Sequence, residues 1–269
     1  MALAFAQKGR CLVLAARTRG ELEETAAACR QAGAEALPVT ADVSSWNEVQ
    51  SLVEAAIKAR GRVDVLVNSA GVYGPIGPTS DVDPEAWTRA IAVNLLGTFH
   101  LCRAVIPHMK AQREGKIILL GGGGATAPLP NFSSYAAAKA GVARLADTLA
   151  EELRDFNVQV NVIAPGLVDT RLQDDVLAAS ERAGPLFEKV RIARESREGA
   201  VPPDIAAGLA LFLASPASGG LTGKLISAPH DPWREWSGKS DELNKSPLYT
   251  IRRLDPFTIA PLIRDLSSV

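Results

Sequence analysis

The sequence predicts an α/β domain built on a doubly wound, mostly parallel sheet with helices on both faces. Two observations support this fold class. Short apolar segments rich in Val, Ile and Leu alternate along the chain with longer segments of helical composition. That alternation is typical of parallel strands joined by helical crossovers. The 269 residues, 47% of them hydrophobic, suffice for a sizeable core and exclude wholesale disorder.

The first half of the chain supplies three of the predicted strands. A short helix at 1–7 stops at Gly9, and the apolar run 11–16 predicts a strand buried on both faces. The remaining elements of this half are a helix at 21–32 closed by Gly33, a strand at 36–40, a helix at 45–60 capped by Ser44 or Ser45, a strand at 63–67, and a helix at 84–112 that we expect Pro107 to bend or break.

The second half repeats the alternation and then departs from it. Its predicted elements are a strand at 116–120 followed by four glycines, a helix at 133–156, a strand at 158–163, a charged and mobile segment at 172–201, a helix at 203–214 and a strand at 224–227. We therefore divide the chain into one domain at 1–228 and an irregular extension at 229–269. Aromatic residues in the extension predict that it packs on the domain, and partner binding is the alternative (Trp233, Trp236, Tyr249 and Phe257).

Composition excludes several functional classes. A net charge of −1 gives no overall electrostatic case for nucleic acid binding. Cys11, Cys29 and Cys102 have no disulfide or metal-ligand spacing, which predicts reduced core thiols in a cytoplasmic protein without a metal site. No uninterrupted apolar run reaches the roughly 18 residues of a membrane span, and the amino terminus lacks a secretory pattern.

Tyr135 and Lys139 are the first candidate catalytic pair. Their four-residue separation in a predicted helix puts both side chains on one face. An ammonium group beside a phenol favours the phenolate, so we expect Lys139 to lower the pKa of Tyr135 from about 10. The pair would then act as a general acid and base near neutral pH. An ordinary surface pair is the alternative for this motif taken alone.

Further motifs occur around this pair in a fixed order. Asn68-Ser-Ala-Gly71 ends a predicted strand, Asn94 lies within Ala-Val-Asn-Leu, and Pro165-Gly166 precedes Val168 and Thr170. With Asp42-Val43 and the Tyr135–Lys139 pair, this series resembles the short-chain dehydrogenase/reductase family over about residues 1–228. The resemblance implies a Rossmann-like fold and hydride exchange between a nicotinamide cofactor and an alcohol or carbonyl compound.

The same resemblance implies a role for each matching residue. Tyr135 would be the acid and base, Lys139 would tune it and bind the nicotinamide ribose, and Asn94 would hold a relay water. Backbone bonding at a helix kink is the alternative for Asn94. The implied cofactor contacts are Asp42 and Val43 at the adenine, Asn68, Ala70 and Gly71 along the adenosine, and Pro165, Gly166, Val168 and Thr170 at the carboxamide. Pro165-Gly166 could instead simply end a strand.

Arg17 bears on which cofactor is used. It ends the strand where the family places an acidic residue for NAD or a basic residue for NADP. With Arg17 and Arg19 present and no acidic residue there, the sequence favours NADP over NAD. A solvated arginine after a strand is the alternative. The resemblance also suggests a homodimer or homotetramer formed through the helices that carry Asn94 and Tyr135.

The glycine-rich phosphate loop of the family has no counterpart in this chain. The family begins with a strand and this loop, whereas residues 1–9 match only the later part of the helix that follows. Leaving the slot of that central strand empty would cost on the order of 10 kcal/mol. We therefore expect either a truncated reading, which we favour, or flanking strands that pair directly. Cofactor binding without the loop is in doubt.

The catalytic serine of the family is also missing. The resemblance aligns it with Gly121, which begins the four-glycine run and has no hydroxyl. Thr126, Ser133 or Ser134 could substitute, although the last two adjoin Tyr135 and should point elsewhere. The run is a poor candidate for a displaced phosphate loop, because Pro128 and Pro130 follow it. We expect slow turnover at best, since one lost oxyanion donor typically costs about 10²–10³ in rate.

Three functions are consistent with these residues. The first is an NAD(P)-dependent oxidoreductase with an impaired site, which the retained Tyr135, Lys139 and Asn94 favour. The second is a catalytically silent binding or scaffold protein, which the two missing motifs favour. The third is a cofactor-free enzyme that uses Tyr135 for dehalogenation or elimination. Nucleotide binding separates the first from the others, and the sequence does not identify the substrate.

Overall fold

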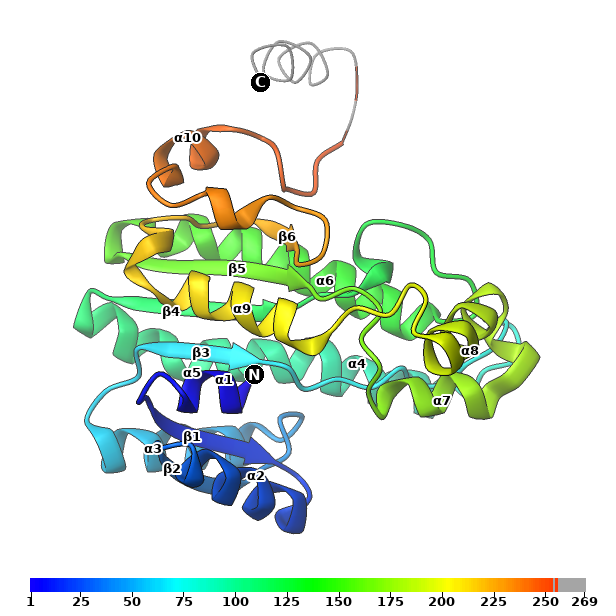
Figure 1. Ribbon diagram of the computed structural model, residues 1–269, viewed down its shortest axis with the longest axis horizontal. Coiled ribbons are helices and arrows are strands. Elements are labelled where there is room, and N and C mark those ends of the chain that lie inside the picture. Colours follow the sequence, from blue (N-terminus) through cyan, green and yellow to red (C-terminus); the bar gives the residue numbers. More distant parts are fainter. Residues whose placement is uncertain (254, 256–269) are drawn as a thin grey trace.

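The computed structural model describes residues 1–253 and 255. Its strands are all parallel and form two sheets (Figure 1). β1 (Cys11–Ala16) pairs with β2 (Glu35–Thr40). The second sheet has the order β3 (Val65–Asn68), β4 (Gly115–Leu120), β5 (Val158–Ala164) and β6 (Leu225–Ser227). The predicted alternation and parallel arrangement are confirmed.

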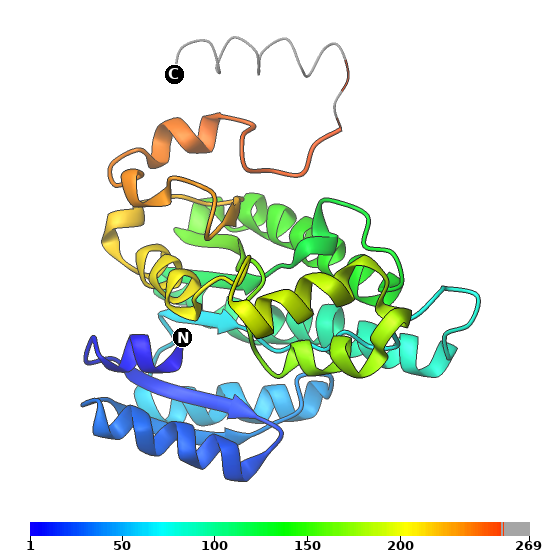
Figure 2. The same ribbon diagram turned by 45° about the vertical axis from the view of Figure 1, so that its right-hand side comes forward.

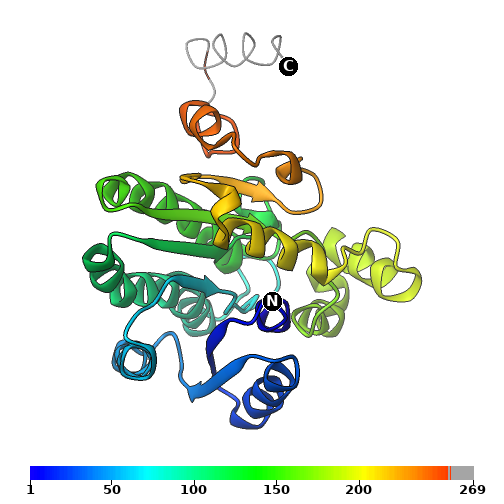
Figure 3. The same cartoon turned by 60° about the vertical axis from the view of Figure 1, so that its left-hand side comes forward.

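The strands β1 and β3 lie on the facing edges of the two sheets (Figure 3). Within the described part of the chain they are not hydrogen-bonded neighbours, so the expectation that the flanking strands pair directly is wrong. Apolar side chains bridge the sheets instead. Val13 and Leu66 join one cluster, while Leu12 joins Val65 in another.

β1 is less buried than its apolar sequence predicts. Its residues are exposed or half-buried along the whole strand, so burial on both faces is a wrong prediction. The physical reason is that β1 has a paired neighbour on only one edge. Cys11, at its start, is exposed, whereas Cys29 and Cys102 are buried as expected of core thiols.

Helices cover both faces of the sheets (Figures 1 and 2). One layer contains α3 (Trp46–Arg60), α5 (Gly97–Gln112) and α6 (Ser133–Glu152), which contribute Val53, Cys102 and Val142 to the main apolar core. The opposite layer contains α1 (Ala2–Ala6), α2 (Arg19–Gln31) and α9 (Pro203–Ala214). Ser45 occupies the N-cap position of α3 without a side-chain capping bond.

The helical region 84–112 continues through Pro107 without a break. It consists of α4 (Pro84–Ile91), a π-helical turn (Ala92–Leu96) and α5, so the irregularity precedes the proline. Asp83 caps α4 by accepting two backbone N–H bonds. The region is long and apolar enough to cross a membrane by composition, but its buried residues, including Leu101 and Met109, pack on the sheets.

The extension begins with a loop against α9. Trp233 and Trp236 are buried, and the Trp233 indole N–H donates to the Ala228 carbonyl at 2.9 Å. After α10 (Ser240–Lys245), the chain returns to β6, where Leu225 N–H donates to the Tyr249 carbonyl at 2.7 Å. Phe257 lies outside the described residues. The division of the chain at residue 228 stays a prediction.

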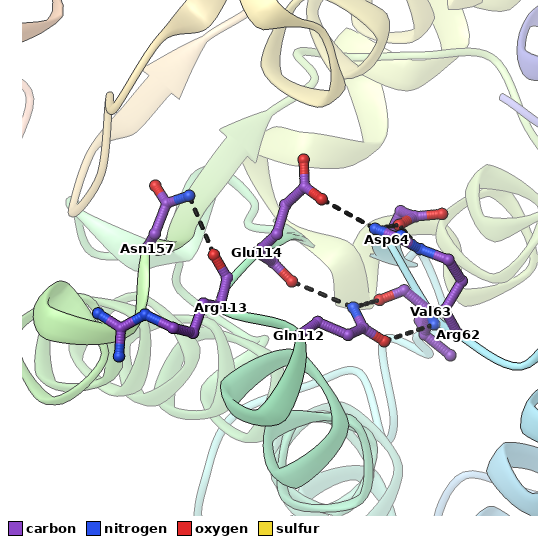
Figure 4. Close-up of polar contacts among 7 residues, drawn as sticks. All are labelled: Arg62, Val63, Asp64, Gln112, Arg113, Glu114 and Asn157. Carbon is purple, nitrogen blue, oxygen red and sulfur yellow. Dashed lines mark hydrogen bonds and ion pairs between the residues drawn. The ribbon is translucent and has the colours of Figure 1, made fainter.

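A polar cluster joins the amino-terminal ends of β3, β4 and β5 (Figure 4). Gln112 exchanges two hydrogen bonds with the Val63 backbone, at 2.9 and 3.1 Å. Arg62 pairs with Glu114 at 2.8 Å, and Asn157 donates to the Arg113 carbonyl at 3.1 Å. These contacts connect the elements at this end of the sheet, opposite the carboxyl ends where the candidate site lies.

Candidate functional site

A cavity of about 350 Å³ lies at the carboxyl ends of β1, β2 and β3. Its lining comes from the loops after these strands and from the α4 region, and it includes Arg17, Asp42, Val72, Arg89 and Val93. Ligands of open parallel sheets bind at this edge. The sequence motifs anticipate Arg17 and Asp42, but Arg89 carries no motif and only its place on α4 brings it here.

Asp42 is held as a carboxylate on one side of this cavity. Ser44 donates to it through its backbone N–H at 2.9 Å and its hydroxyl at 2.7 Å. Burial opposes ionisation, but these hydrogen bonds and the Arg17 charge outweigh it and lower the pKa of Asp42. Val43, predicted at the adenine, packs against Gly97 and is not among the residues that line the cavity.

Asn68 fixes the loop after β3. Its amide donates to the Thr98 hydroxyl at 2.9 Å, and its carbonyl oxygen accepts from Ala70 N–H at 3.1 Å. A side chain at Gly71 would place its Cβ 2.9 Å from the Asn94 Oδ1 atom, so the loop depends on close backbone approach there. The structure thus brings Gly71 against Asn94 of the π-helical turn and joins Asn68 to Thr98 on α5.

Asn94 is fully buried in that turn. Its amide donates to the carbonyl groups of Val72 at 2.8 Å and Ala90 at 2.9 Å, and its oxygen accepts from Val72 N–H at 3.1 Å. This geometry matches the alternative in which Asn94 bonds backbone groups at an irregularity of the helix. A role in a proton relay stays a prediction.

Tyr135 and Lys139 share one buried face of α6, with exposed fractions of 7% and 4%. Lys139 Nζ donates to the Leu120 carbonyl at 2.8 Å and lies 5.6 Å from the centroid of the Tyr135 ring. Burial lowers the pKa of Lys139 to about 8. Burial, with a smaller contribution from Tyr73, raises the pKa of Tyr135.

The expectation that Lys139 lowers the pKa of Tyr135 is therefore wrong for this structure. The ammonium group bonds a carbonyl rather than the phenol oxygen, and the buried phenol lacks the water that would stabilise its anion. Tyr135 is consequently protonated at neutral pH, in the form that can donate a proton.

Two aromatic side chains lie beside Tyr135, and the sequence motifs do not indicate them. The Tyr73 ring lies 4.8 Å from the Tyr135 ring and 5.0 Å from the Phe132 ring, between centroids. Tyr73 donates its hydroxyl hydrogen to the Gln173 Oε1 atom at 3.3 Å, and Gln173 donates to the Val168 carbonyl at 3.3 Å. Tyr73 therefore connects Tyr135 with the segment after β5.

The four glycines lie between β4 and α6. A Cβ at Gly121 would sit 2.9 Å from Val162 Cγ1, whereas a Cβ at Gly122 would sit 2.3 Å from the Tyr135 Oη atom. Gly122, not Gly121, therefore faces the phenol, and the alignment of the missing serine with Gly121 is wrong in space. The error is one residue, which in an extended chain reverses the side-chain direction.

The nearby hydroxyl side chains do not replace the missing serine. Ser134 donates to the Tyr73 carbonyl at 3.3 Å, and Ser133 accepts from the Trp87 indole N–H at 3.1 Å, so both point away from the phenol as expected. Thr126 is exposed.

The segment after β5 begins with Pro165-Gly166. Gly166 has a φ of +80°, and a Cβ there would lie 2.6 Å from Val201 Cγ2, so this position favours glycine for conformation and for space. Thr170 is exposed, and its carbonyl accepts from Gln173 N–H at 2.9 Å. Whether these residues hold a carboxamide stays a prediction.

The charged segment 172–201 is largely helical in the structure. It forms α7 (Leu172–Ala179) and α8 (Pro185–Ser196). Arg194 on α8 pairs with Asp174 on α7 at 2.8 Å. Arg171 pairs with Glu21 on α2 and so connects this segment to the first sheet. The residues 1–253 and 255 contain no cluster of three or more His, Cys, Asp or Glu side chains that could hold a metal ion.

Comparison with known proteins places this geometry among oxidoreductases. The family model for short chain dehydrogenase matches residues 1–181. The chain is 36% identical over 234 residues to 3beta-hydroxysteroid dehydrogenase 1 of Eggerthella lenta, covering 84% of this chain and 85% of that protein. It is 31% identical over 236 residues to a 3-oxoacyl-(acyl-carrier-protein) reductase of Thermotoga maritima, covering 83% and 88%.

Two solved structures with a cofactor named in their descriptions are similar. NAD⁺-bound xylitol dehydrogenase matches with a TM-score of 0.77 at 26% identity, covering 84% of this chain and 90% of that one. An actinorhodin polyketide ketoreductase variant with NADPH matches with a TM-score of 0.77 at 29% identity, covering 84% and 88%.

Proposed function

Because the chain belongs to the short-chain dehydrogenase family, we propose that it is an NAD(P)-dependent oxidoreductase that interconverts an alcohol and a carbonyl compound. One observation carries the proposal. Tyr135 and Lys139 meet on a buried face of α6, close to the carboxyl end of β4, with the phenol against Gly122. A proton donor buried there suits chemistry on a carbonyl oxygen.

The residues present fit the adenosine end of a nicotinamide cofactor. Asp42 and Arg17 line a cavity large enough to take part of a nucleotide. Lys139 on α6, which does not line this cavity, would bind the nicotinamide ribose instead. When bound, the cofactor supplies or accepts the hydride. The described chain offers no glycine-rich loop ahead of β1 for the pyrophosphate, so we assign no residue to that group.

The protonation of Tyr135 near neutral pH suits the proton transfer that carbonyl reduction requires. Burial raises the pKa of its phenol, which therefore keeps its proton and can pass it to a carbonyl oxygen. Alcohol oxidation needs the phenolate as base. We expect oxidation to become faster as the pH rises well above neutral.

A panel of ketones tests this function against the alternatives. The relatives suggest a 3-oxosteroid, a 3-oxoacyl thioester and a sugar-derived ketone, each mixed with the protein and NADPH or NADH. Loss of nucleotide absorbance at 340 nm with formation of the alcohol supports an oxidoreductase. No oxidation of either nucleotide with any ketone would favour the scaffold protein, or the cofactor-free enzyme.

We further propose NADP as the preferred cofactor, because Arg17 lines the cavity and no acidic residue stands at the end of β1. Replacing Arg17 by Ala should raise the Kd for NADPH about tenfold and leave that for NADH unchanged, since a charged hydrogen bond to a phosphate is lost. Nucleotide fluorescence titration measures both constants. Arg19→Ala, at an exposed position that does not line the cavity, is the matched control. An equal effect on NADH would contradict the assignment.

We also propose a cytoplasmic homodimer or homotetramer. Leu96 and Phe99, on the helical region that carries Asn94, are 45% and 46% exposed, and exposed apolar side chains on one helix favour association. Phe99→Glu should convert the assembly into a 28.4 kDa monomer in light scattering. Leu3→Glu, at an equally exposed leucine on α1, should leave the assembly intact. A monomeric parent protein would overturn this proposal.

A further inference from the structure

A second cavity, of about 200 Å³, lies between α6 and the carboxyl-terminal extension. Its walls come from the second half of α6, from the turn before β6 and from the chain around α10, and most of the side chains that line it are polar or charged. Lys224, in that turn, directly precedes β6, the outer strand of its sheet (Figure 1). The cavity therefore lies toward the amino-terminal ends of the strands, away from the candidate site at their carboxyl ends.

Positive charge exceeds negative charge in this cavity, because four cationic side chains and two carboxylates line it. Each carboxylate has an arginine of its own. Arg144 pairs with Asp147 at 2.9 Å, and Arg154 pairs with Glu151 at 2.7 Å. These two pairs neutralise each other, so the other two cations carry the excess.

The two cations in excess, Lys224 and Arg252, have no acidic partner. The Lys224 ammonium donates to the Ser246 carbonyl at 2.7 Å and to the Leu248 carbonyl at 3.1 Å. Arg252 donates from its Nε atom to the Thr250 hydroxyl at 3.3 Å. Within residues 1–253 and 255, neither cation has a carboxylate within 4 Å.

This arrangement is unfavourable for Lys224, whose residue is only 3% exposed. Buried charges in proteins are normally paired with an opposite charge. Burial and the like charge of Arg252 lower the pKa of Lys224 to about 8, although Asp147 acts in the opposite direction. An anion bound between the two cations would replace their repulsion by attraction to a common partner.

Hydrogen-bond donors in the cavity are also without acceptors. The Nη atoms of Arg252 donate to no described residue. The Thr222 hydroxyl accepts from Val160 N–H at 3.0 Å, and among the described residues its own hydrogen has no acceptor. Two unmatched positive charges with guanidinium and hydroxyl donors suit a doubly charged anion rich in oxygen atoms, which is the chemistry of a phosphate group.

We propose that this cavity binds a phosphate group, inorganic or esterified, through Arg252, Lys224 and Thr222. Its volume admits such a group together with several waters. Lys224 precedes α10 in the chain and Arg252 follows it. A bound phosphate group would therefore hold the two ends of this part of the extension together and stabilise its packing on α6.

Titration calorimetry at pH 7 tests the site, with inorganic phosphate and glycerol phosphate as probes and sodium chloride holding the ionic strength constant. Arg252→Gln should raise the Kd at least tenfold, because a charged hydrogen bond is lost. Arg252→Lys, which keeps the charge, should stay within about threefold of the parent. Arg10→Gln, at an exposed position that does not line the cavity, is the matched control and should not change the Kd.

The two probes distinguish the sources of the phosphate group. Binding of both assigns the site to the phosphate group itself, and binding of glycerol phosphate alone assigns it to phosphate esters. Binding of neither probe by the parent protein, or an equal Kd for the parent and Arg252→Gln, would overturn the inference.

Thermal unfolding gives a second readout. Phosphate at ten times its Kd should raise the unfolding midpoint of the parent by about 2–4 °C, and Arg252→Gln should lose this rise. An equal rise with sodium chloride at the same ionic strength would show general screening and would contradict the site. Neither measurement uses a nicotinamide nucleotide or a ketone, so the outcome is independent of the proposed function.

Discussion

Replacement of Tyr135 by Phe is expected to lower kcat by a factor of about 10²–10⁴ and to leave the fold intact. The change removes only the hydroxyl, which hydrogen-bonds to no described residue, and keeps the ring packed against Tyr73 at 4.8 Å. The midpoint of thermal unfolding should therefore stay within about 2 °C of the parent. Steady-state kinetics with a ketone and NADPH, together with circular dichroism, measure both quantities.

Tyr249→Phe is the matched control for this change. Tyr249 packs its ring 4.6 Å from the Trp236 ring, on the extension and away from α6. Loss of its hydroxyl should not alter kcat. If Tyr135→Phe kept more than a tenth of the parent activity, Tyr135 would not be the proton donor.

Replacement of Lys139 by Met should abolish turnover and at the same time stabilise the protein at pH 7. Burial lowers the pKa of Lys139 to about 8, whereas the unfolded chain keeps it near 10.5. Below pH 8 the folded state therefore carries a penalty of about 3 kcal/mol for the buried charge. Loss of the hydrogen bond to the Leu120 carbonyl offsets about 1–2 kcal/mol. A net gain of about 1–2 kcal/mol remains.

The pH dependence of that gain is its most specific feature. Between pH 8 and 10.5 the unfolded chain binds more protons at Lys139 than the folded chain does, so the parent gains stability relative to Lys139→Met as the pH rises. In urea unfolding, Lys139→Met should have a higher free energy of unfolding than the parent at pH 7, and this difference should be lost at pH 10. Lys58→Met, at an exposed position on α3, should show no such trend. A constant difference across this range would contradict a buried, charged Lys139.

The sequence alone predicts most of the elements because their signals are local. Alternating apolar and helical segments locate the strands, and Gly61, with a φ of +75°, ends α3 as a left-handed residue can. The sequence offers a helix kink at Asn94 only as an alternative, because the contacts that stabilise the π-helical turn at Ala92–Leu96 join Asn94 to Val72, twenty-two residues away. The break that Pro107 predicts does not occur, because packing against the core holds the helix on both sides of it.

The candidate site is predictable in its residues but not in its electrostatics. Tyr135 and Lys139 can be identified from their spacing. Their burial, which the spacing does not indicate, raises the pKa of Tyr135 and lowers the pKa of Lys139. Which glycine faces the phenol depends on the direction of the chain at a single residue, Gly122. Tyr73 and Gln173 meet across a hundred residues, and no local pattern signals such a contact.

Titration of the protein with NADPH, followed by nucleotide fluorescence, tests the central claim most directly. The account predicts saturable binding to the folded protein, weakened by Arg17→Ala and unaffected by Arg19→Ala, because the cavity beside Asp42 and Arg17 takes the adenosine. Absence of binding to a sample whose circular dichroism and cooperative unfolding show it to be folded would contradict the assignment of this chain as a nicotinamide-dependent oxidoreductase.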